Sequence, residues 1–377
     1  MTTPLLVVVG ARPNMVKVAP VWHALAALGI EQRLLHTGQH YDHALSGSFL
    51  EQLDLPDPDV FLGVGSGTHG EQTAAALVGV ERALLEEEHV AVLVAGDVNS
   101  TLAAALAAAK LGVPVIHLEA GLRSGDWTMP EEINRVVCDR LSDLLLCPSA
   151  DALDALAAEG VSRDRAVVVG NTMIDTLLRL SEPDRADVVR TRLGARAGSY
   201  VLVTLHRPAV VDDASRLSAA MEALSALAAR LPVLFPVHPR TRARLAETAW
   251  VPPQGLQLLD PLSYTEFIAL EAGARLVVTD SGGVQEETSA LGVPCLTYRT
   301  TTERPITVEL GTNRVIGVDP GVLLDVASEE LDRPFLRKRS AIPLWDGRAG
   351  PRAADAIADF LAGLPDAVRG QSVRDRA

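Results

Sequence analysis

The sequence contains few cysteines. Only Cys138, Cys147 and Cys295 occur among its 377 residues, and no two of them form a CxxC pair. A small, odd number of widely spaced cysteines excludes a disulfide framework and favours a reducing compartment. We therefore predict a cytoplasmic protein.

Long apolar runs are also missing. The run at 5–9 is too short for a secretory signal and has no basic segment before it. The longest later run, 101–116, is interrupted by Lys110 and Pro114, so it is unsuited to crossing a bilayer. We predict a protein without a membrane partner.

Positive charge and aromatic side chains are both scarce. The chain has 34 Lys and Arg against 48 Asp and Glu, a net charge of -14, which argues against nucleic acid as a partner. Aromatic residues make up 4% of a chain that is 48% hydrophobic, a composition more typical of an α/β protein than of a β-sandwich. The length is sufficient for two domains.

The chain alternates short β-branched runs with Ala/Leu-rich segments of helical spacing. Strands without internal polar alternation, separated by helices, indicate parallel sheets covered on both faces. There are too many strands for one such sheet, and a polar segment at 181–198 divides them into two sets. We predict an α/β fold with Rossmann-like domains at 1–175 and 176–350, a helix at 351–366 that packs on the first domain, and a disordered tail at 367–377.

Ligands of open α/β sheets bind outside the carboxyl ends of the strands. For two such domains we expect an active site in the cleft between them. The residues that directly follow strands should then carry the chemistry.

Two sequence patterns suggest ligands that we do not favour. The segment GSGTHG at 65–70 has the letters of a dinucleotide fingerprint, but no strong strand precedes it and no ribose-binding acid follows at the right distance. We favour a glycine loop before a helix at 71–85. His36, His40 and His43 lie in one loop without supporting Cys or Glu. We predict neither a metal nor a cofactor.

Two βα turns have the composition of phosphate sites. In the turn at 7–17, Gly10 permits a tight turn, and Arg12 and Lys17 would face a phosphate near the start of the next helix. A solvated basic pair is the alternative. In the segment at 279–294, Ser-Gly-Gly opens a glutamate-rich helix. Glutamates repel a bare phosphate, so a ligand with phosphates and sugar hydroxyls fits better, with Glu286 or Glu287 accepting the hydroxyls.

Acids and histidines follow several predicted strands. Asp97 and Glu119 come directly after buried runs, Glu131 and Glu132 open a helix at Pro130, and Arg135 lies one turn beyond Glu131. In the second half of the chain His206 and His238 end strands in the same way. Helix-capping acids and structural histidines are common, so each position alone has a plain structural alternative. Three acids at successive strand ends are harder to explain in that way.

These motifs resemble one family when taken in order. GARPNMVK, GDVNSTLA, HLEAGLRSGD, MPEEINR, VGNTMID, PVHPRT, TDSGGVQEE and TTERPITVELGTN follow the order seen in bacterial UDP-N-acetylglucosamine 2-epimerases, over about 5–363. The resemblance implies a two-domain fold of GT-B type, a UDP-sugar substrate, no nicotinamide and a homodimer.

The resemblance also implies roles for individual residues. The catalytic carboxylates would be Asp97, Glu119 and Glu131, with His206 as the strand-end histidine. Arg12 and Lys17 would lie where UDP and the sugar are approached. The nucleotide-sugar contacts would come from Arg135, His238, Ser281, Gly282, Gly283, Glu287 and Arg304, and Phe267 would stack near the uracil.

The implied reaction explains the need for several acids. The C2 proton of UDP-N-acetylglucosamine is not next to a carbonyl, so the family first eliminates UDP to give 2-acetamidoglucal, then returns a proton to the opposite face as UDP re-adds. Two faces require at least two titratable groups. The alternatives are a hydrolysing epimerase that releases free ManNAc and UDP, an epimerase of a UDP-diacetamido-uronic acid, a GT-B glycosyltransferase and a non-catalytic nucleotide-sugar binder.

The sequence departs from the family pattern at three places. Asn14 replaces a frequent glutamate, HRPAVV replaces HRRE after His206, and QHYDH replaces the QHRxM-type segment of an allosteric site. Ala75 or Ala76 takes the place of that site's arginine. We therefore predict weak or absent activation by UDP-N-acetylglucosamine.

Overall fold

The computed structural model describes residues 3–39, 49–248, 250–335, 337 and 341–365. Its chain divides into two compact units. The first unit contains the described residues up to Thr176 and those from Pro343 onward, and the second unit contains Leu177–Ile342.

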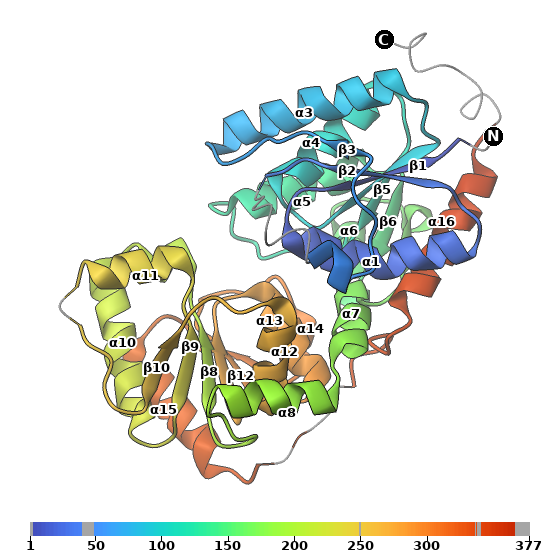
Figure 1. Cartoon of the computed structure of the whole chain (residues 1–377). Coiled ribbons are helices and arrows are strands. Elements are labelled where there is room, and N and C mark those ends of the chain that lie inside the picture. Colours follow the sequence, from blue (N-terminus) through green and yellow to red (C-terminus); the bar gives the residue numbers. More distant parts are fainter. Residues whose placement is uncertain (1–2, 40–48, 249, 336, 338–340, 366–377) are drawn as a thin grey trace. The chain divides into compact units, whose positions relative to one another are not determined.

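The first unit is built on a seven-stranded parallel sheet with the order β3-β2-β1-β4-β5-β6-β7 (Figure 1). Its strands are β1 (Leu5–Val9), β2 (Gln32–His36), β3 (Val60–Phe61), β4 (Ala91–Ala95), β5 (Val115–Leu118), β6 (Leu144–Cys147) and β7 (Ala166–Val168). Every residue of β1, β4, β5 and β6 is buried. Continuous apolar strands are expected where helices cover both faces of a parallel sheet.

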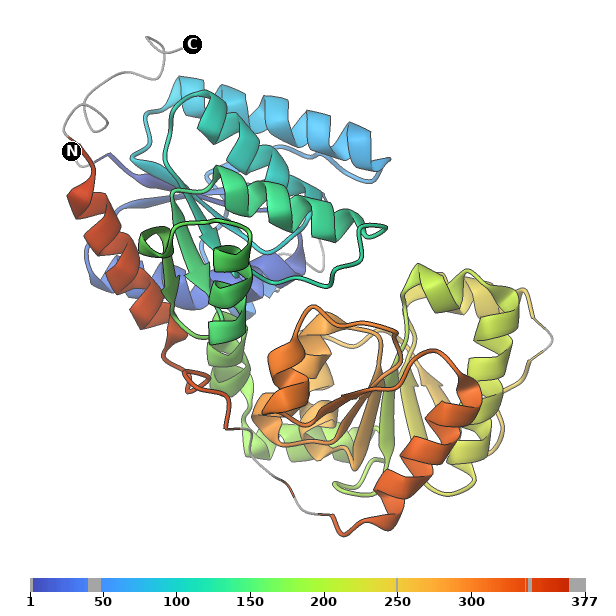
Figure 2. The ribbon, with the colours of Figure 1, turned by 180° about the vertical axis from the view of Figure 1, so that it is seen from behind.

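Helices and one 3₁₀ turn cover the sheet of the first unit. They are α1 (Arg12–Ala27), α3 (His69–Glu86), α4 (Asn99–Lys110), α5 (Pro130–Leu141), α6 (Ala150–Ala158), η1 (Arg163–Arg165), α7 (Thr172–Leu180), whose last turn enters the second unit, and α16 (Ala349–Gly363). Helices α3, α4 and α5 pack side by side, and the late helix α16 lies along α1 (Figures 1 and 2).

The second unit repeats this design with a six-stranded parallel sheet of order β10-β9-β8-β11-β12-β13. Its strands are β8 (Val201–Thr204), β9 (Val233–Pro236), β10 (Leu256–Leu259), β11 (Leu276–Thr279), β12 (Cys295–Thr297) and β13 (Asn313–Val315). Its helices are α8 (Pro183–Arg192), α9 (Pro208–Val211), α10 (Ala214–Ala228), α11 (Pro239–Ala246), α12 (Tyr264–Gly273), α13 (Gly282–Leu291), α14 (Pro305–Glu309) and α15 (Pro320–Asp332).

Alternate residues of one strand enter two different cores in the second unit. Val201 and Val203 of β8 pack with α10 and α15, whereas Tyr200 and Leu202 pack with α12 and α13. This alternation follows from strand geometry, in which successive side chains point to opposite faces. The strand therefore reads as an unbroken apolar run because each of its two faces is covered.

Both sheets reverse their strand order at one point. In the first unit the reversal falls between β1 and β4, and in the second between β8 and β11. Ligands of such sheets bind beside the carboxyl ends of the strands at this switch point. The predicted residues after β1, β4, β8 and β11 therefore lie at the sheet edges where a ligand is expected.

The chain returns to the first unit earlier than the predicted boundary at 350. Residues 343–350 group with the first unit, where Trp345 Nε1 donates to the Pro148 carbonyl (3.1 Å) and the backbone N–H groups of Ala349 and Gly350 donate to Asp175 (3.1 and 2.7 Å). Two buried amide donors on one carboxylate fix the start of α16. The predicted tail at 367–377 lies outside the described residues.

The glycine segment at 65–70 leads into α3. Thr68 is the N-cap of this helix, and its hydroxyl accepts from the Glu71 N–H (3.3 Å) while the Glu71 carboxylate accepts from the Thr68 N–H (2.9 Å). This is a reciprocal capping box.

Among the described residues, no helix is both long and apolar enough to cross a membrane.

Candidate active-site residues

The first βα turn is held by Asn14, the residue that departs from the family pattern. Its side-chain oxygen accepts from the N–H groups of Gly10 and Ala11 (3.1 and 3.0 Å), and its amide nitrogen donates to the Ala95 carbonyl at the end of β4 (2.8 Å). Asn14 is buried. The Asn14 amide therefore connects the end of β1 to the end of β4 by hydrogen bonds. These bonds require a side chain with both an acceptor and a donor.

Lys17 lies one turn further along α1 and contacts Glu119. Its ammonium forms an ion pair with Glu119 Oε2, and both side chains are about 8% exposed. Glu119 follows β5 with a φ of 70°, a left-handed conformation that is uncommon for a non-glycine residue. Such backbone strain is frequently found at functional sites. Gly96 passes close by, since a Cβ there would lie 3.0 Å from Lys17 Nζ and 3.2 Å from Glu119 Oε2.

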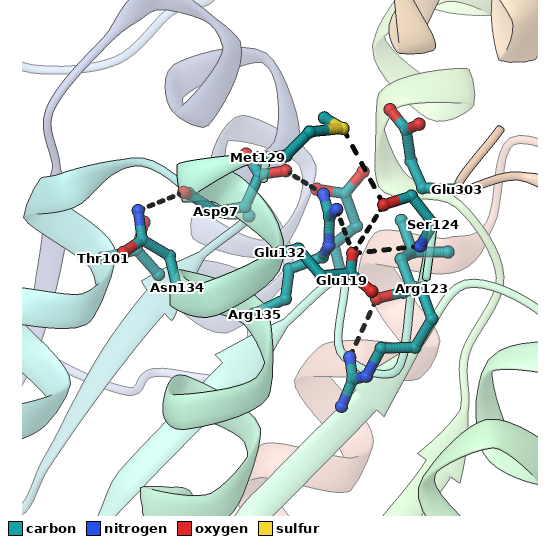
Figure 3. A network of polar contacts seen from close by, with 12 residues as sticks. Asp97, Thr101, Glu119, Arg123, Ser124, Met129, Glu132, Asn134, Arg135 and Glu303 are labelled. Atoms are coloured by element: carbon teal, nitrogen blue, oxygen red, sulfur yellow. Dashed lines mark hydrogen bonds and ion pairs between the residues drawn. The ribbon is translucent and has the colours of Figure 1, made fainter. Parts of the chain in front are cut away.

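Asp97 follows β4 and pairs with a buried arginine. The Arg135 guanidinium of α5 bridges Asp97 Oδ2 and Glu132 Oε2, each at 2.6 Å (Figure 3). Arg135 and Glu132 are each 2% exposed, whereas the Asp97 side chain is 25% exposed. Asp97 thus reaches solvent while a buried cation fixes one of its oxygens.

The partner of Arg135 on its own helix is Glu132 and not Glu131. Glu132 also accepts from Ser124 N–H (3.0 Å) and Gly125 N–H (2.9 Å). Burial alone would raise the pKa of Glu132, but these amides and Arg135 together lower it. Glu131 lies partly exposed in the first turn of α5, where the helix dipole favours a carboxylate.

A buried histidine that the sequence did not single out lies behind these acids. His117 of β5 hydrogen-bonds the Gly96 carbonyl through Nε2 (2.8 Å) and Asp139 through Nδ1 (2.6 Å). A carbonyl and a carboxylate both require a donor, so the ring carries two protons. Burial lowers the pKa of His117, but the charges of Cys138 and Asp139 raise it well above its ordinary value. The cluster fixes the Gly96 backbone beside Asp97.

In the second unit, His206 meets an aspartate from the neighbouring strand end. Asp280 follows β11, accepts from the His206 and Arg207 N–H groups (2.9 and 2.8 Å) and lies 3.1 Å from His206 Nδ1. Burial raises the pKa of Asp280, but His206 and the two amides lower it overall. The ring of His238 lies 6.0 Å from that of His206. The two predicted histidines therefore come together.

The Ser-Gly-Gly turn is packed against charged side chains. Ser281 is the N-cap of α13, and Gly282 and Gly283 form its first turn. A Cβ at Gly282 would lie 2.5 Å from both Arg304 Nη1 and Glu303 Oε1, so any larger residue there would displace these side chains. Arg304 itself is buried and pairs with Glu303 (2.7 Å) and Glu286 (2.9 Å). It lies beside the N-terminus of α13, where a phosphate would find free amides.

The remaining predicted residues of the second unit lie on α12 and α13. Glu287 is buried and accepts from the Tyr264 hydroxyl at 2.7 Å. Phe267 is half-buried beside the core of α12 and α13. Glu286, the other candidate for a sugar hydroxyl, is instead paired with Arg304. Burial and this pairing leave Glu287 as the better candidate.

Arg12 and the histidine loop complete the account of predicted residues. Arg12 is exposed at the first position of α1. His36 Nδ1 accepts from the Gly38 N–H (2.9 Å), and burial lowers the pKa of His36 to about 4. His40 and His43 lie outside the described residues. Within the described ranges, no group of three His, Cys, Asp or Glu side chains could hold a metal ion.

Comparison with known proteins identifies relatives along nearly the whole chain. Residues 23–358 match the family described as UDP-N-acetylglucosamine 2-epimerase. An enzyme of that name from Methanocaldococcus jannaschii is 40% identical over 357 residues, 92% of this chain and 97% of the relative. A UDP-2,3-diacetamido-2,3-dideoxy-D-glucuronate 2-epimerase from Pseudomonas aeruginosa is 40% identical over 370 residues, 96% of this chain and 99% of the relative.

Solved structures agree with the predicted fold class. The crystal structure of the M. jannaschii UDP-GlcNAc 2-epimerase in complex with UDP-GlcNAc and UDP matches with a TM-score of 0.86 at 38% identity, over 95% of this chain and 100% of that one. A UDP co-structure from S. aureus matches with a TM-score of 0.87 at 29% identity, over 97% and 98%. The predicted α/β fold of GT-B type, with two parallel sheets, is confirmed.

Proposed function

Because the chain belongs to the UDP-N-acetylglucosamine 2-epimerase family, as its motifs predict, we propose that it interconverts UDP-N-acetylglucosamine and UDP-N-acetylmannosamine without net hydrolysis. The observation that carries the proposal is a pair of carboxylates at neighbouring strand ends. Asp97 follows β4 and Glu119 follows β5, and each is paired with a buried cation, Arg135 and Lys17.

The proposed reaction begins with loss of UDP. The C1–O bond breaks and its electron pair leaves with UDP, while a base takes the C2 proton and the C1–C2 double bond of 2-acetamidoglucal forms. Positive charge develops near C1 in this step, and nearby carboxylates stabilise it. Return of UDP to C1 with a proton delivered to the opposite face of C2 gives the epimer. Asp97, Glu119 and Glu131 supply these acids and bases, assisted by His206.

The groups that hold the leaving UDP come mainly from the second unit in this proposal. Ser281, Gly282 and Gly283 offer backbone N–H groups at the start of α13, and Arg304 adds a fixed guanidinium beside them. Glu287 accepts ribose hydroxyls, His238 contacts the nucleotide sugar, and Phe267 stacks near the uracil. In the first unit, Arg135 and Lys17 hold the carboxylates, and exposed Arg12 meets the nucleotide sugar.

A proton NMR time course in D₂O tests the proposal. With UDP-N-acetylglucosamine, we expect UDP-N-acetylmannosamine carrying deuterium at C2, because the removed proton exchanges with solvent. Free N-acetylmannosamine and accumulating UDP would instead establish the hydrolysing reaction. An unchanged spectrum would contradict the proposed substrate.

A second substrate has support from one observation. The P. aeruginosa enzyme named for UDP-2,3-diacetamido-2,3-dideoxy-D-glucuronate is as similar to this chain, at 40% identity, as the M. jannaschii enzyme named for UDP-N-acetylglucosamine. Epimerisation of a UDP-diacetamido-uronic acid is therefore the alternative. Parallel assays with both UDP-sugars decide between them by the ratio of kcat/KM values.

The proposal extends to assembly and compartment. We propose a homodimer that acts in the cytoplasm. Light scattering behind size-exclusion chromatography measures the mass, and a value near that of one 40.0 kDa chain would contradict the dimer.

A further inference from the structure

Glu271 of α12 is a charged residue in an unusual place. It is 0% exposed, and no hydrogen-bond donor among the described residues reaches either of its carboxyl oxygens. An isolated ionised carboxylate in such surroundings is strongly disfavoured. The residue is therefore a neutral acid or shares a proton with a neighbour.

The neighbour that Glu271 reaches is Glu287. The two buried carboxyl groups are close enough to interact, and a hydrogen bond between them requires that one of them carries a proton. Burial and the charge of Glu287 raise the pKa of Glu271 well above its ordinary value. Burial raises the pKa of Glu287 to about 7, against the opposing hydrogen bonds from Tyr264 and Glu271. Glu271 is thus the group that keeps its proton.

The other ionisable groups around the pair add no positive charge to it. Tyr264 on α12 donates to Glu287, and Glu286 on α13 is a further carboxylate that is paired with Arg304. Tyr200, before β8, and Cys295 of β12 each have a raised pKa, chiefly because of burial.

Helix α8 packs on α12 and carries Arg190, and Arg337 donates to the Ala272 carbonyl, next to Glu271 in the chain. Arg190 donates to the Ala269 carbonyl (2.8 Å) and pairs with Asp187. At the other end of α12, Glu266 pairs with Arg192 at the surface. These contacts leave the Glu271–Glu287 pair to be stabilised by its shared proton.

We propose that Glu271 is a positioning residue, which in its protonated form donates to Glu287 and holds that carboxylate ionised and oriented to accept the ribose hydroxyls of the UDP-sugar. The inference rests on the proposed function in one respect, the contact of Glu287 with the ribose. It assigns to α12 a specific part in nucleotide binding: a neutral acid donates to the binding carboxylate.

A dependence of UDP affinity on pH follows. A ribose hydroxyl donates best to an ionised carboxylate, so binding of UDP favours loss of the Glu287 proton. With a pKa of about 7 for Glu287 in the free protein, UDP binds about tenfold more weakly at pH 6 than at pH 8. Binding of 2′,3′-dideoxy-UDP, which lacks the two hydroxyls, lacks this dependence.

Three variants separate positioning from simple packing. Glu271→Gln keeps a donor for Glu287, so the midpoint of the affinity profile stays near that of the wild type. Glu271→Met keeps the volume but removes the donor, so the midpoint rises by about one pH unit and UDP binds roughly tenfold more weakly at pH 7. The matched control Glu222→Gln changes an exposed carboxyl on α10 and leaves the profile unchanged.

The experiment is isothermal titration of UDP into each protein from pH 5.5 to 9. A raised midpoint in Glu271→Met, with rescue by Glu271→Gln, supports the inference. Coincident profiles for wild type and Glu271→Met overturn it, while UDP binding and epimerisation by the wild type leave the proposed function standing. Failure of the wild type to bind UDP at any pH overturns both.

A second measurement covers the case in which Glu271→Met does not fold. In wild-type protein labelled with ¹³C at glutamate side-chain carboxyls, one signal keeps the chemical shift of a protonated acid at pH 8, and it is missing from Glu271→Gln. Ionised shifts for all glutamates at pH 8 would overturn the inference.

Discussion

The two units share the same strand order over six strands but differ in how their acidic side chains are paired. In the first unit, the acids after β4 and β5 are each paired with a cation, Asp97 with Arg135 and Glu119 with Lys17. In the second unit, Asp280 after β11 pairs with His206, while Glu271 and Glu287 pair with each other.

This difference indicates which acids can change their protonation when a substrate binds. A carboxylate beside a permanent cation can stabilise a developing positive charge and can act as an acid or a base. A carboxylate that shares a proton changes its charge with ligand and pH, which suits the recognition of hydroxyl donors. We therefore assign chemistry to the acids of the first unit and nucleotide binding to those of the second.

Removal of a first-unit acid should give the largest effect. Asp97→Asn keeps the size of the side chain but removes its charge, and we expect kcat to fall roughly 10³-fold, within the range of general acid–base contributions. Binding of UDP should change little. The control Asp154→Asn removes an exposed acid paired with Arg163. Retention of more than about a tenth of kcat in Asp97→Asn would break the assignment.

Removal of a first-unit cation should reduce stability. Arg135→Met leaves Glu132 buried without its cation, a change that costs about 3–5 kcal/mol of unfolding free energy at pH 7. Urea unfolding measures the loss, with the exposed Arg163→Met as control.

The same variant has a pH signature. The pKa of Glu132 is lowered in the folded protein, so its stabilisation is present above the unfolded pKa of about 4.3 and is lost as the pH falls through the folded value. The difference between wild type and Arg135→Met should therefore shrink in acid. A difference that grows below pH 4 would contradict this account.

Asp280→Asn tests a strand-end acid of the second unit that, like the acids of the first, has a basic partner. The asparagine cannot replace a charge that accepts two N–H groups and faces His206, so we expect a loss of about 2 kcal/mol of unfolding free energy. The control is Asp260→Asn, whose aspartate side chain is 94% exposed. Equal stability of the two variants would show that Asp280 contributes no more to the free energy of unfolding than an exposed acid.

Gly282→Ala tests whether the turn at the start of α13 contributes to UDP binding. The added Cβ would lie 2.5 Å from Arg304 Nη1, so the guanidinium must move away from the helix N-terminus. We expect UDP to bind roughly tenfold more weakly, which is about 1.4 kcal/mol. Gly363→Ala, with open space around the added methyl, is the control. Unchanged affinity would remove Arg304 from the phosphate site.

The smallest expected effect is on regulation. The allosteric segment of the family is altered at QHYDH, and position 76 is a buried alanine. Turnover should therefore follow a hyperbolic curve in substrate concentration, with a Hill coefficient of about 1. Strong sigmoidicity in the UDP-ManNAc direction that UDP-GlcNAc relieves would show that the site has been retained by other residues.

The fold and most strand-end residues could be predicted from the sequence because buried parallel strands leave a clear signal. Asp97, Glu119, His206 and His238 all stand where an apolar run stops. Pairings across the chain left no such signal. Lys17 pairs with Glu119, which lies 102 positions away in the sequence. Arg135 pairs with Glu132, although Glu131 is also about one helical turn from it.

Residues within apolar helices were the hardest to anticipate. Glu271 lies in FIALEAG, where one acid among apolar residues is typical of a helix with a solvated edge. Its complete burial results from tertiary packing, which the sequence alone does not reveal. His117 was hidden in the same way within a buried strand.

One pair of variants tests most directly whether the first unit carries the chemistry and the second unit binds the nucleotide. Glu119→Gln and Glu287→Gln remove one acid from each unit, and both are assayed for kcat and for the Kd of UDP. The account predicts that Glu119→Gln loses kcat by roughly 10³-fold with its UDP affinity kept, whereas Glu287→Gln binds UDP at least tenfold more weakly and retains most of kcat at saturation. Loss of the same parameter in both variants would contradict it.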